Sequence, residues 1–345
     1  MTTTHIDVNV IDFDALGAWM DAQGLPGGPF EDVSPVAGGT QNVMVRFSRG
    51  GVPYVLRRPP LHLRAKSNEV LRREARVLAA LGGTPVAAPR LVAACTDESV
   101  LGGAVFYLME PVDGFNASTG LPEPHASDPA IRHRMGLEAA AALAELGRVD
   151  HEAVGLAGFG RPEGFLERQV PRWMGELEGY SALDGYPGPD IPGLERTAAW
   201  LEDNRPAAFT PGIMHGDYHL SNLMFAYDGP RVAAIVDWEM CTIGDPLLDL
   251  GWLLATWPGG EGDWGIGTTI TGLPEGRELV AHYAALSGRD LSAINWYATM
   301  ACFKLGIVLE GTHARACAGK APKDIGDALH ATTLALFARA QTFME

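Results

Sequence analysis

Three polar side chains near residue 220 have the types and the spacing that phosphoryl transfer requires. Asp217 and Asn222 lie five residues apart in the segment HGDYHLSN, and Asp237 ends the apolar run VAAIVD. One carboxylate must orient an attacking hydroxyl and accept its proton, and two oxygen ligands must hold Mg²⁺ against the phosphates of ATP. We therefore predict that Asp217 is the catalytic base and that Asn222 and Asp237 are the Mg²⁺ ligands, with ATP as phosphate donor.

A plainer interpretation of these residues is possible. Asp and Asn favour turns, so Asp217 and Asn222 could be turn residues and Asp237 could cap the next segment. However, the separation of Asp217 and Asn222 is that of the kinase catalytic loop. The complete pattern, HGDxHxxN followed by an apolar strand that ends in DWE, favours the catalytic interpretation.

The elements that must position these residues change in kind near residue 111. Before it, a short helix at 12–23 precedes strand-like runs at 43–47, 53–58, 90–95 and 104–110, with a helical pattern at 67–81. After it, helical patterns cover about 128–147, 165–178, 193–204, 246–256, 275–287, 291–311 and 323–343, and only 213–237 carries two short β-type runs. The pattern predicts a bilobal α+β fold, with a small β-rich N-lobe over 1–111 and a larger helical C-lobe over 112–345.

Two segments carry a resemblance to a known family. MHGDYHLSNLMF and IVDWEMCTIGDPLLDLGWLL resemble the aminoglycoside phosphotransferase-like branch of the kinase fold. They are most similar to the subgroup whose kinase domain occurs in acyl-CoA dehydrogenase fusion proteins, and YVLRRPP, LRREARVLAAL and FYLMEPVDG resemble that subgroup more weakly. The resemblance implies a protein-kinase-like fold, with ATP bound by the N-lobe and with the catalytic loop and substrate site in the C-lobe.

The resemblance also implies roles for N-lobe residues. Glu74 resembles the acid that pairs with the basic residue of the third strand, where Arg57 stands in place of the usual lysine. The arginine guanidinium can donate two hydrogen bonds to phosphate oxygens and can pair with Glu74. It is not equivalent to lysine, whose ammonium group is a point charge. The alternatives are an exposed edge-strand Arg57 and a functional Arg58.

The remaining ATP contacts are expected from backbone segments. Gly39 and Thr40, in a glycine turn that lacks G-x-G-x-x-G, could present donors to phosphate oxygens, although a plain hairpin turn fits equally well. Glu110 and Val112 resemble the hinge whose backbone would hold adenine.

Other polar residues near the catalytic motif are expected to support it. His215 is expected to brace the backbone, and His219 and Glu239 could contact the substrate. Asp245 precedes a proline at a helix start, so it either caps that helix or braces the catalytic loop.

The amino-acid composition limits which binding partners and which cellular location are expected for this chain. The chain of 345 residues has 26 Lys+Arg against 42 Asp+Glu, a net charge of −16, so a broad nucleic-acid surface is not expected. No apolar run is long enough to span a membrane, and the four cysteines (Cys95, Cys241, Cys302 and Cys317) are scattered, so a cytoplasmic protein with reduced thiols is expected. Its oligomeric state cannot be read from the sequence.

The phosphate acceptor is expected to be a hydroxyl of a small molecule. The subgroup resemblance suggests a hydroxyacyl-CoA or a hydroxy acid, and the broader family suggests an aminoglycoside or a macrolide. A basic cluster slightly favours an anionic ligand; its members are Arg57, Arg58, His62, Arg64 and Lys66. A nucleotide-binding pseudokinase scaffold is the alternative from another class, although the joint presence of Asp217, Asn222 and Asp237 argues against it.

Overall fold

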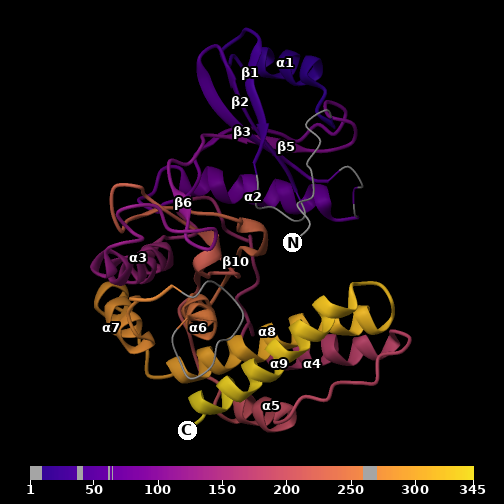
Figure 1. Cartoon of the computed structure of the whole chain (residues 1–345), viewed down its shortest axis with the longest axis vertical. Helices are drawn as coiled ribbons and strands as arrows, with labels where there is room; N and C mark the ends of the chain where they lie inside the picture. Colours follow the sequence, from indigo (N-terminus) through magenta and orange to yellow (C-terminus); the bar gives the residue numbers. More distant parts are fainter. Residues whose placement is uncertain (1–9, 37–41, 61–62, 64, 259–269) are drawn as a thin grey trace. The chain divides into compact units, whose positions relative to one another are not determined.

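The structure is a computed structural model that describes residues 10–36, 42–60, 63, 65–258 and 270–345. It is a mixed α+β fold, as the sequence predicted, and it divides into two compact units (Figure 1). The first unit comprises Met1–Asp113 and Ala233–Glu239, and the second comprises Gly114–Val232 and Met240–Glu345. The sequence analysis placed Asp237 in the C-lobe, whereas the structure groups its segment with the β-rich unit. Among the described residues, no helix combines the length and apolarity needed to cross a membrane.

The first unit is built on a five-stranded antiparallel sheet of order β1-β2-β3-β5-β4. Its strands are β1 (Phe30–Pro35), β2 (Val43–Arg49), β3 (Val52–Arg58), β4 (Leu91–Cys95) and β5 (Phe106–Met109). The sequence analysis missed β1, because this edge strand is largely exposed and lacks apolar alternation. The register sets Arg57 of β3 opposite Met44 of β2 and Tyr107 of β5, so the three side chains are cross-strand neighbours.

Two helices pack on this sheet (Figure 1). Helix α1 (Phe13–Ala22) buries Leu16 and Met20 in a core with Phe47, Leu56 and Phe106. Helix α2 (Ser67–Leu81) has a buried apolar face formed by Leu71, Val77, Leu78 and Leu81. Glu74 lies on that buried face, so the helix carries one carboxylate into the interior of the unit.

The second unit is mainly helical. Its helices are α3 (Pro129–Arg148), α4 (Gln169–Gly179), α5 (Leu194–Asp203), α6 (Leu247–Thr256), α7 (Gly276–Ser287), α8 (Ile294–Cys317) and α9 (Lys323–Phe343). The expected helix over 165–178 begins later, and the helix expected to end at 311 continues to Cys317.

Short strands frame the catalytic motif in this unit. β7 (Gly212–Met214) pairs antiparallel with β10 (Thr242–Gly244), and β6 (Phe115–Asn116) pairs antiparallel with β8 (Leu223–Phe225). The sequence analysis missed β6 and β10, because two or three residues are too few to show a period. β9 (Val232–Ile235) leads to Asp237, and the Ile235 amide donates to the Ala87 carbonyl at 2.8 Å, which ties this strand into the first unit.

Candidate active site

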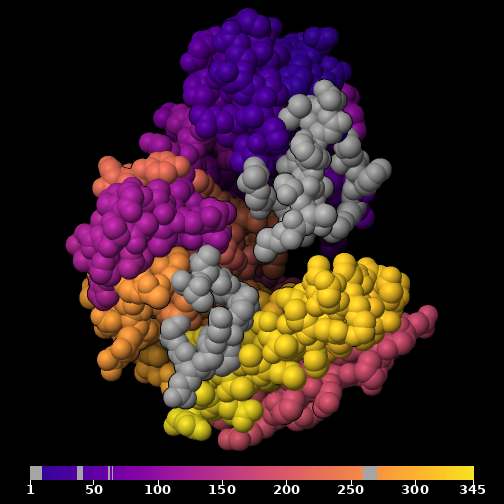
Figure 2. All heavy atoms as spheres, viewed as in Figure 1, coloured from indigo at the N-terminus to yellow at the C-terminus, as the bar shows by residue number. Residues whose placement is uncertain are grey.

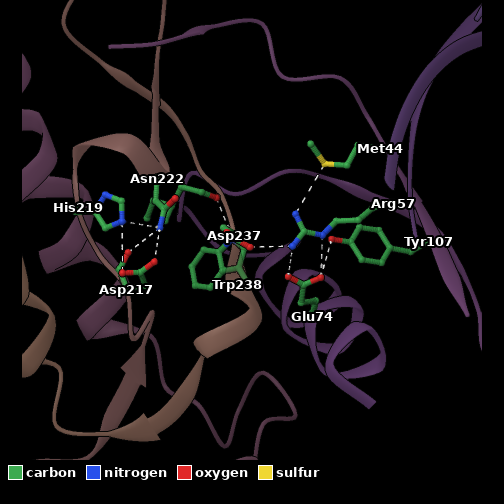
Figure 3. Close-up of polar contacts among 10 residues, drawn as sticks. Met44, Arg57, Glu74, Tyr107, Asp217, His219, Asn222, Asp237 and Trp238 are labelled. Atoms are coloured by element: carbon green, nitrogen blue, oxygen red, sulfur yellow. Dashed lines mark hydrogen bonds and ion pairs between the residues drawn. The ribbon is translucent and has the colours of Figure 1, made fainter. Parts of the chain in front are cut away.

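In the first unit, Arg57 and Glu74 form a buried, bidentate ion pair (Figure 3). Arg57 Nη2 donates to Glu74 Oε1 at 2.8 Å and Nε donates to Oε2 at 3.0 Å. Arg57 is 8% exposed and Glu74 is 1% exposed, so the alternative of an exposed edge-strand arginine is wrong. Arg58 is also buried, and its guanidinium donates to the carbonyls of Pro59 and Val10 rather than to an acidic side chain.

The same arginine binds a second carboxylate. Arg57 Nη2 also donates to Asp237 Oδ1 at 2.8 Å, and the Tyr107 hydroxyl lies 3.4 Å from Glu74 Oε2. Burial works to lower the pKa of Arg57, but Glu74, Tyr107 and Asp237 outweigh it and raise that pKa. Burial likewise raises the pKa of Glu74 while Arg57 lowers it, and two short hydrogen bonds to separate carboxylate oxygens fit the ionised form. The guanidinium therefore stays charged and is held in one orientation.

Asp237 has a backbone conformation that few non-glycine residues adopt. Its φ is 67°, in the left-handed region, which costs about 1–3 kcal/mol and persists only where the surroundings enforce it. Its side chain is 38% exposed, so one carboxylate is held by Arg57 yet still reaches solvent. Such strain at a solvent-accessible acid is typical of active sites.

A group of three carboxylates surrounds this position. One oxygen each from Glu74, Asp237 and Glu239 lies within 4.8 Å of the others. Mg²⁺ prefers carboxylate and carbonyl oxygens, so the donor set fits this ion. The sequence analysis expected Glu239 to support the site or to contact the substrate, and the structure sets it beside the candidate metal ligand Asp237.

In the second unit, Asp217 and Asn222 are joined directly. Asn222 Nδ2 donates to Asp217 Oδ2 at 3.0 Å and to the Asp217 carbonyl at 2.9 Å, and His219 Nε2 lies 3.4 Å from Asp217 Oδ1 (Figure 3). The side-chain nitrogen of Asn222 donates to Asp217, so the side-chain oxygen, Oδ1, is the atom of Asn222 that could ligate a metal ion. Gly216 has a φ of 87°, and a Cβ there would stand 2.5 Å from the Met240 carbonyl oxygen, so only glycine fits this turn.

The charge of Asp217 is set by its neighbours. Burial works to raise the pKa of Asp217, but His219, His215 and Lys304 outweigh it and lower this pKa to about 2. The carboxylate is therefore ionised across the physiological range. Such a weak base orients a hydroxyl and accepts its proton only late in the reaction, when that proton has become acidic.

The loop that holds Asp217 is braced by an aspartate of α6. Asp249 accepts hydrogen bonds from the amides of His215 and Gly216 at 2.6 and 2.8 Å, while His215 Nδ1 accepts from the Asp217 amide at 3.3 Å. Asp245 instead accepts from the Leu247 amide, as a cap does, and from the Tyr297 hydroxyl. Of the two interpretations of Asp245, capping is the one that these contacts match, and Asp249 performs the bracing.

The sequence analysis missed Lys304, a half-buried cation behind the candidate catalytic loop. Its Nζ donates to the Gly216 carbonyl at 3.2 Å and lies 4.3 Å from the ring centre of Trp252. Burial lowers the pKa of Lys304 to about 8, although Asp249 and Asp217 oppose this shift. A single lysine within the apolar run NWYATMACFKLGIVL is the signal that could have revealed it.

Replacing Lys304 with methionine should alter how stability depends on pH. A lysine whose pKa falls from 10.5 to about 8 on folding destabilises the folded state at and below pH 8, and this cost disappears as pH rises to 10.5. From pH 8 to 10, the unfolding free energy of the wild type should therefore rise relative to that of Lys304→Met, by at most about 1.4 kcal/mol per pH unit. Urea unfolding at several pH values measures this difference, with Lys320→Met as an exposed control. Parallel curves for the wild type and Lys304→Met would refute the buried-cation assignment.

The other predicted ATP contacts are only partly described. Gly39 and Thr40 lie outside the described residues, as do His62 and Arg64 of the basic cluster. The Glu110 amide already donates to the Arg90 carbonyl at 2.9 Å, so this group is not free for adenine. Val112 is half-buried and remains the hinge candidate.

Comparisons with known proteins identify the family and the fold. The sequence pattern of the phosphotransferase enzyme family matches residues 32–296. Acyl-CoA dehydrogenase family member 11 of Gallus gallus is 32% identical over 86% of this chain, which spans 39% of that protein and 34% of a similar Arabidopsis thaliana protein. The chain therefore spans a little over a third of the length of these curated relatives.

Solved structures agree on the fold. A Ralstonia eutropha crystal structure, provisionally assigned as an aminoglycoside phosphotransferase, has a TM-score of 0.80 and 30% identity, and the match covers 96% of this chain and 99% of that one. A complex of aminoglycoside phosphotransferase APH(4)-Ia with ADP and hygromycin B has a TM-score of 0.56 at 12% identity, covers 91% of this chain and 97% of its own, and shares the fold.

The β-rich and helical units thus form a protein-kinase-like α+β fold of the phosphotransferase class. The chain belongs to the phosphotransferase enzyme family, and its relatives include proteins named as members of the acyl-CoA dehydrogenase family.

Proposed function

We propose that this chain transfers the γ-phosphate of ATP to a hydroxyl group of a small molecule. The observation that carries the proposal is the ionised Asp217 carboxylate, which Asn222 orients and which is still 34% exposed to an incoming acceptor. Asp217 accepts the hydrogen bond of the acceptor hydroxyl and aims its oxygen at the γ-phosphorus. As the new O–P bond forms, the bond from the γ-phosphorus to the bridging oxygen breaks, ADP leaves, and the proton of the hydroxyl passes to Asp217.

The first unit supplies the nucleotide side of this proposal. Arg57, fixed by Glu74, directs its charge at phosphate oxygens, and the backbone at Val112 receives the base. Asp237 and Asn222 hold Mg²⁺, with Glu239 as a further oxygen donor beside Asp237. When bound, Mg²⁺ neutralises charge on the transferring phosphate. In this proposal the region over 1–111 binds ATP and the region over 112–345 binds the acceptor.

We infer a hydroxyacyl-CoA, or the matching hydroxy acid, as the acceptor. One consideration supports it over an antibiotic: several relatives are named as acyl-CoA dehydrogenases. The Ralstonia eutropha neighbour supports the alternative of an aminoglycoside. The two classes differ in charge, since aminoglycosides are polycations.

A coupled ADP-release assay with Mg²⁺ and ATP tests the reaction and the acceptor together. The panel holds hydroxyacyl-CoA esters, the free hydroxy acids, an aminoglycoside and a macrolide, with Asp217→Asn as the inactive control. Turnover is expected with the hydroxyacyl compounds and not with the antibiotics. Turnover with an antibiotic alone would overturn the acceptor assignment, and nucleotide binding without turnover on any compound would favour a scaffold.

A further inference from the structure

A cluster of metal-binding side chain types lies on α8 and α9, outside the catalytic loop. Glu310 and His313 stand one turn apart on α8, and His330 faces them from α9. His330 Nδ1 lies 2.7 Å from Glu310 Oε2, and the two imidazole rings stack with centroids 4.5 Å apart. The proposed phosphotransfer uses none of these three residues.

The close packing of the two helices fixes this arrangement. Thr333 of α9 donates its hydroxyl to the Gly306 carbonyl of α8 at 3.0 Å, and Gly306 leaves room for the ring of Phe337. The helices therefore approach closely just beside the cluster, and this packing brings the three side chains together.

The geometry of the three side chains suits a metal ion. One ring nitrogen from each imidazole and one oxygen of Glu310 lie within 4.8 Å of one another, close enough for a single ion to reach all three. A bound ion would replace the contact between His330 and Glu310 by bonds from both groups to the metal. Two imidazoles with one carboxylate form a donor set typical of zinc and related transition metals.

Two further observations distinguish this cluster from an ordinary buried hydrogen-bond network. Glu310 is fully buried, and the Tyr186 hydroxyl donates to its second oxygen at 2.8 Å, as the outer partners of ligating carboxylates do. His313 Nδ1 is buried and has no hydrogen-bond partner among the residues that the structure describes, although the Asp327 carboxylate lies 3.9 Å away. A carboxylate at that place is the usual neighbour of a metal-ligating imidazole.

We propose that Glu310, His313 and His330 bind one divalent transition-metal ion, with Zn²⁺ as the ion that fits best. Imidazole nitrogens and the nearby Cys317 thiol, 3.6 Å from His313 Nε2, favour Zn²⁺ over Mg²⁺, which prefers oxygen ligands. The His330 side chain is 23% exposed, and α9 lies at the surface of the second unit in Figure 2, so an ion can enter from solvent. The site would join α8 to α9 across the C-terminal hairpin.

Calorimetric titration of the full chain with Zn²⁺ tests this site. The protein is first stripped with a chelator and kept in excess Mg²⁺ without nucleotide, so that the result does not depend on the proposed phosphotransfer. One Zn²⁺ per chain is expected in the wild type and in His282→Gln, a histidine of α7 outside the cluster. The combined variant His313→Gln and His330→Gln should lose this binding. Unchanged Zn²⁺ binding in that variant, or none in the wild type, would overturn the proposal.

A milder variant covers the possibility that the double variant does not fold. Tyr186→Phe keeps all three ligands and removes only the hydrogen bond to Glu310, so it should weaken Zn²⁺ binding by about 10- to 100-fold. Co²⁺ supplies a spectroscopic signature, since its visible bands intensify in a low-symmetry site with nitrogen ligands and should be weak in His330→Gln. Equal Zn²⁺ affinity in Tyr186→Phe, together with equal Co²⁺ bands in His330→Gln, would mean that the cluster is only a buried hydrogen-bond network.

Discussion

Replacing Asp217 with asparagine should lower kcat by about 100- to 10,000-fold, because the hydroxyl of the acceptor then loses the carboxylate that orients it and accepts its proton. Asparagine has nearly the same shape and can still accept the hydrogen bond from Asn222 through its side chain oxygen. The thermal midpoint and the KM for ATP should therefore change little. Initial rates of ADP release at saturating ATP and acceptor measure this effect.

A matched substitution separates the loss of the base from a general loss of charge. Asp228→Asn makes the same chemical change at an exposed turn of the second unit and should leave kcat within about twofold of the wild type. If Asp217→Asn retained most of its turnover while Asp228→Asn behaved as expected, Asp217 would not be the catalytic base.

Replacing Arg57 with methionine should lower the unfolding free energy by about 3–5 kcal/mol, because it leaves the buried Glu74 without its partner. It should also raise the KM for ATP, since the guanidinium that we place against the phosphates is gone. Chemical denaturation measures the first effect and initial rates measure the second.

Two comparisons make this prediction specific. In the combined variant Arg57→Met and Glu74→Met, both buried charges are absent, so much of the stability should return while the KM for ATP stays high. Arg72→Met breaks the exposed pair between Arg72 and Glu98, which solvent screens, so it should lower the unfolding free energy far less than Arg57→Met does. An Arg57→Met effect as small as that of Arg72→Met would show that the Arg57 pair is not a buried structural element.

Arg57→Lys is informative as well, because most kinases use lysine at this position. A lysine keeps the charge but cannot form both hydrogen bonds to Glu74 and a third to Asp237 in one plane. The structure thus gives a reason for the arginine: one guanidinium holds two carboxylates that come from distant parts of the chain.

Local sequence patterns were sufficient to recognise the fold class, the helices and the catalytic motif. The period of apolar residues located α2, α7 and α9 to within a residue or two, because each buries one face against a core. Asp217, Asn222 and Asp237 were predicted as site residues from their order and spacing, since a loop and a strand end are local features. The short strands β6 and β10 and the exposed edge strand β1 escaped detection, because a few residues or a solvated surface leave no periodic signal.

Contacts between distant residues were decided only by the tertiary structure. Sequence reasoning could not decide whether Asp245 caps α6 or braces the loop that holds Asp217, because the same residues at the helix start fit either role. It could not find Lys304, whose charge is meaningful only because α8 carries it to the carbonyl of Gly216. It could not show that Glu239 lies beside Asp237, or that Glu310, His313 and His330 come together between α8 and α9. The physical reason is the same in each case: a buried charge is defined by partners that folding brings together from far along the chain, and no local pattern records which partners those are.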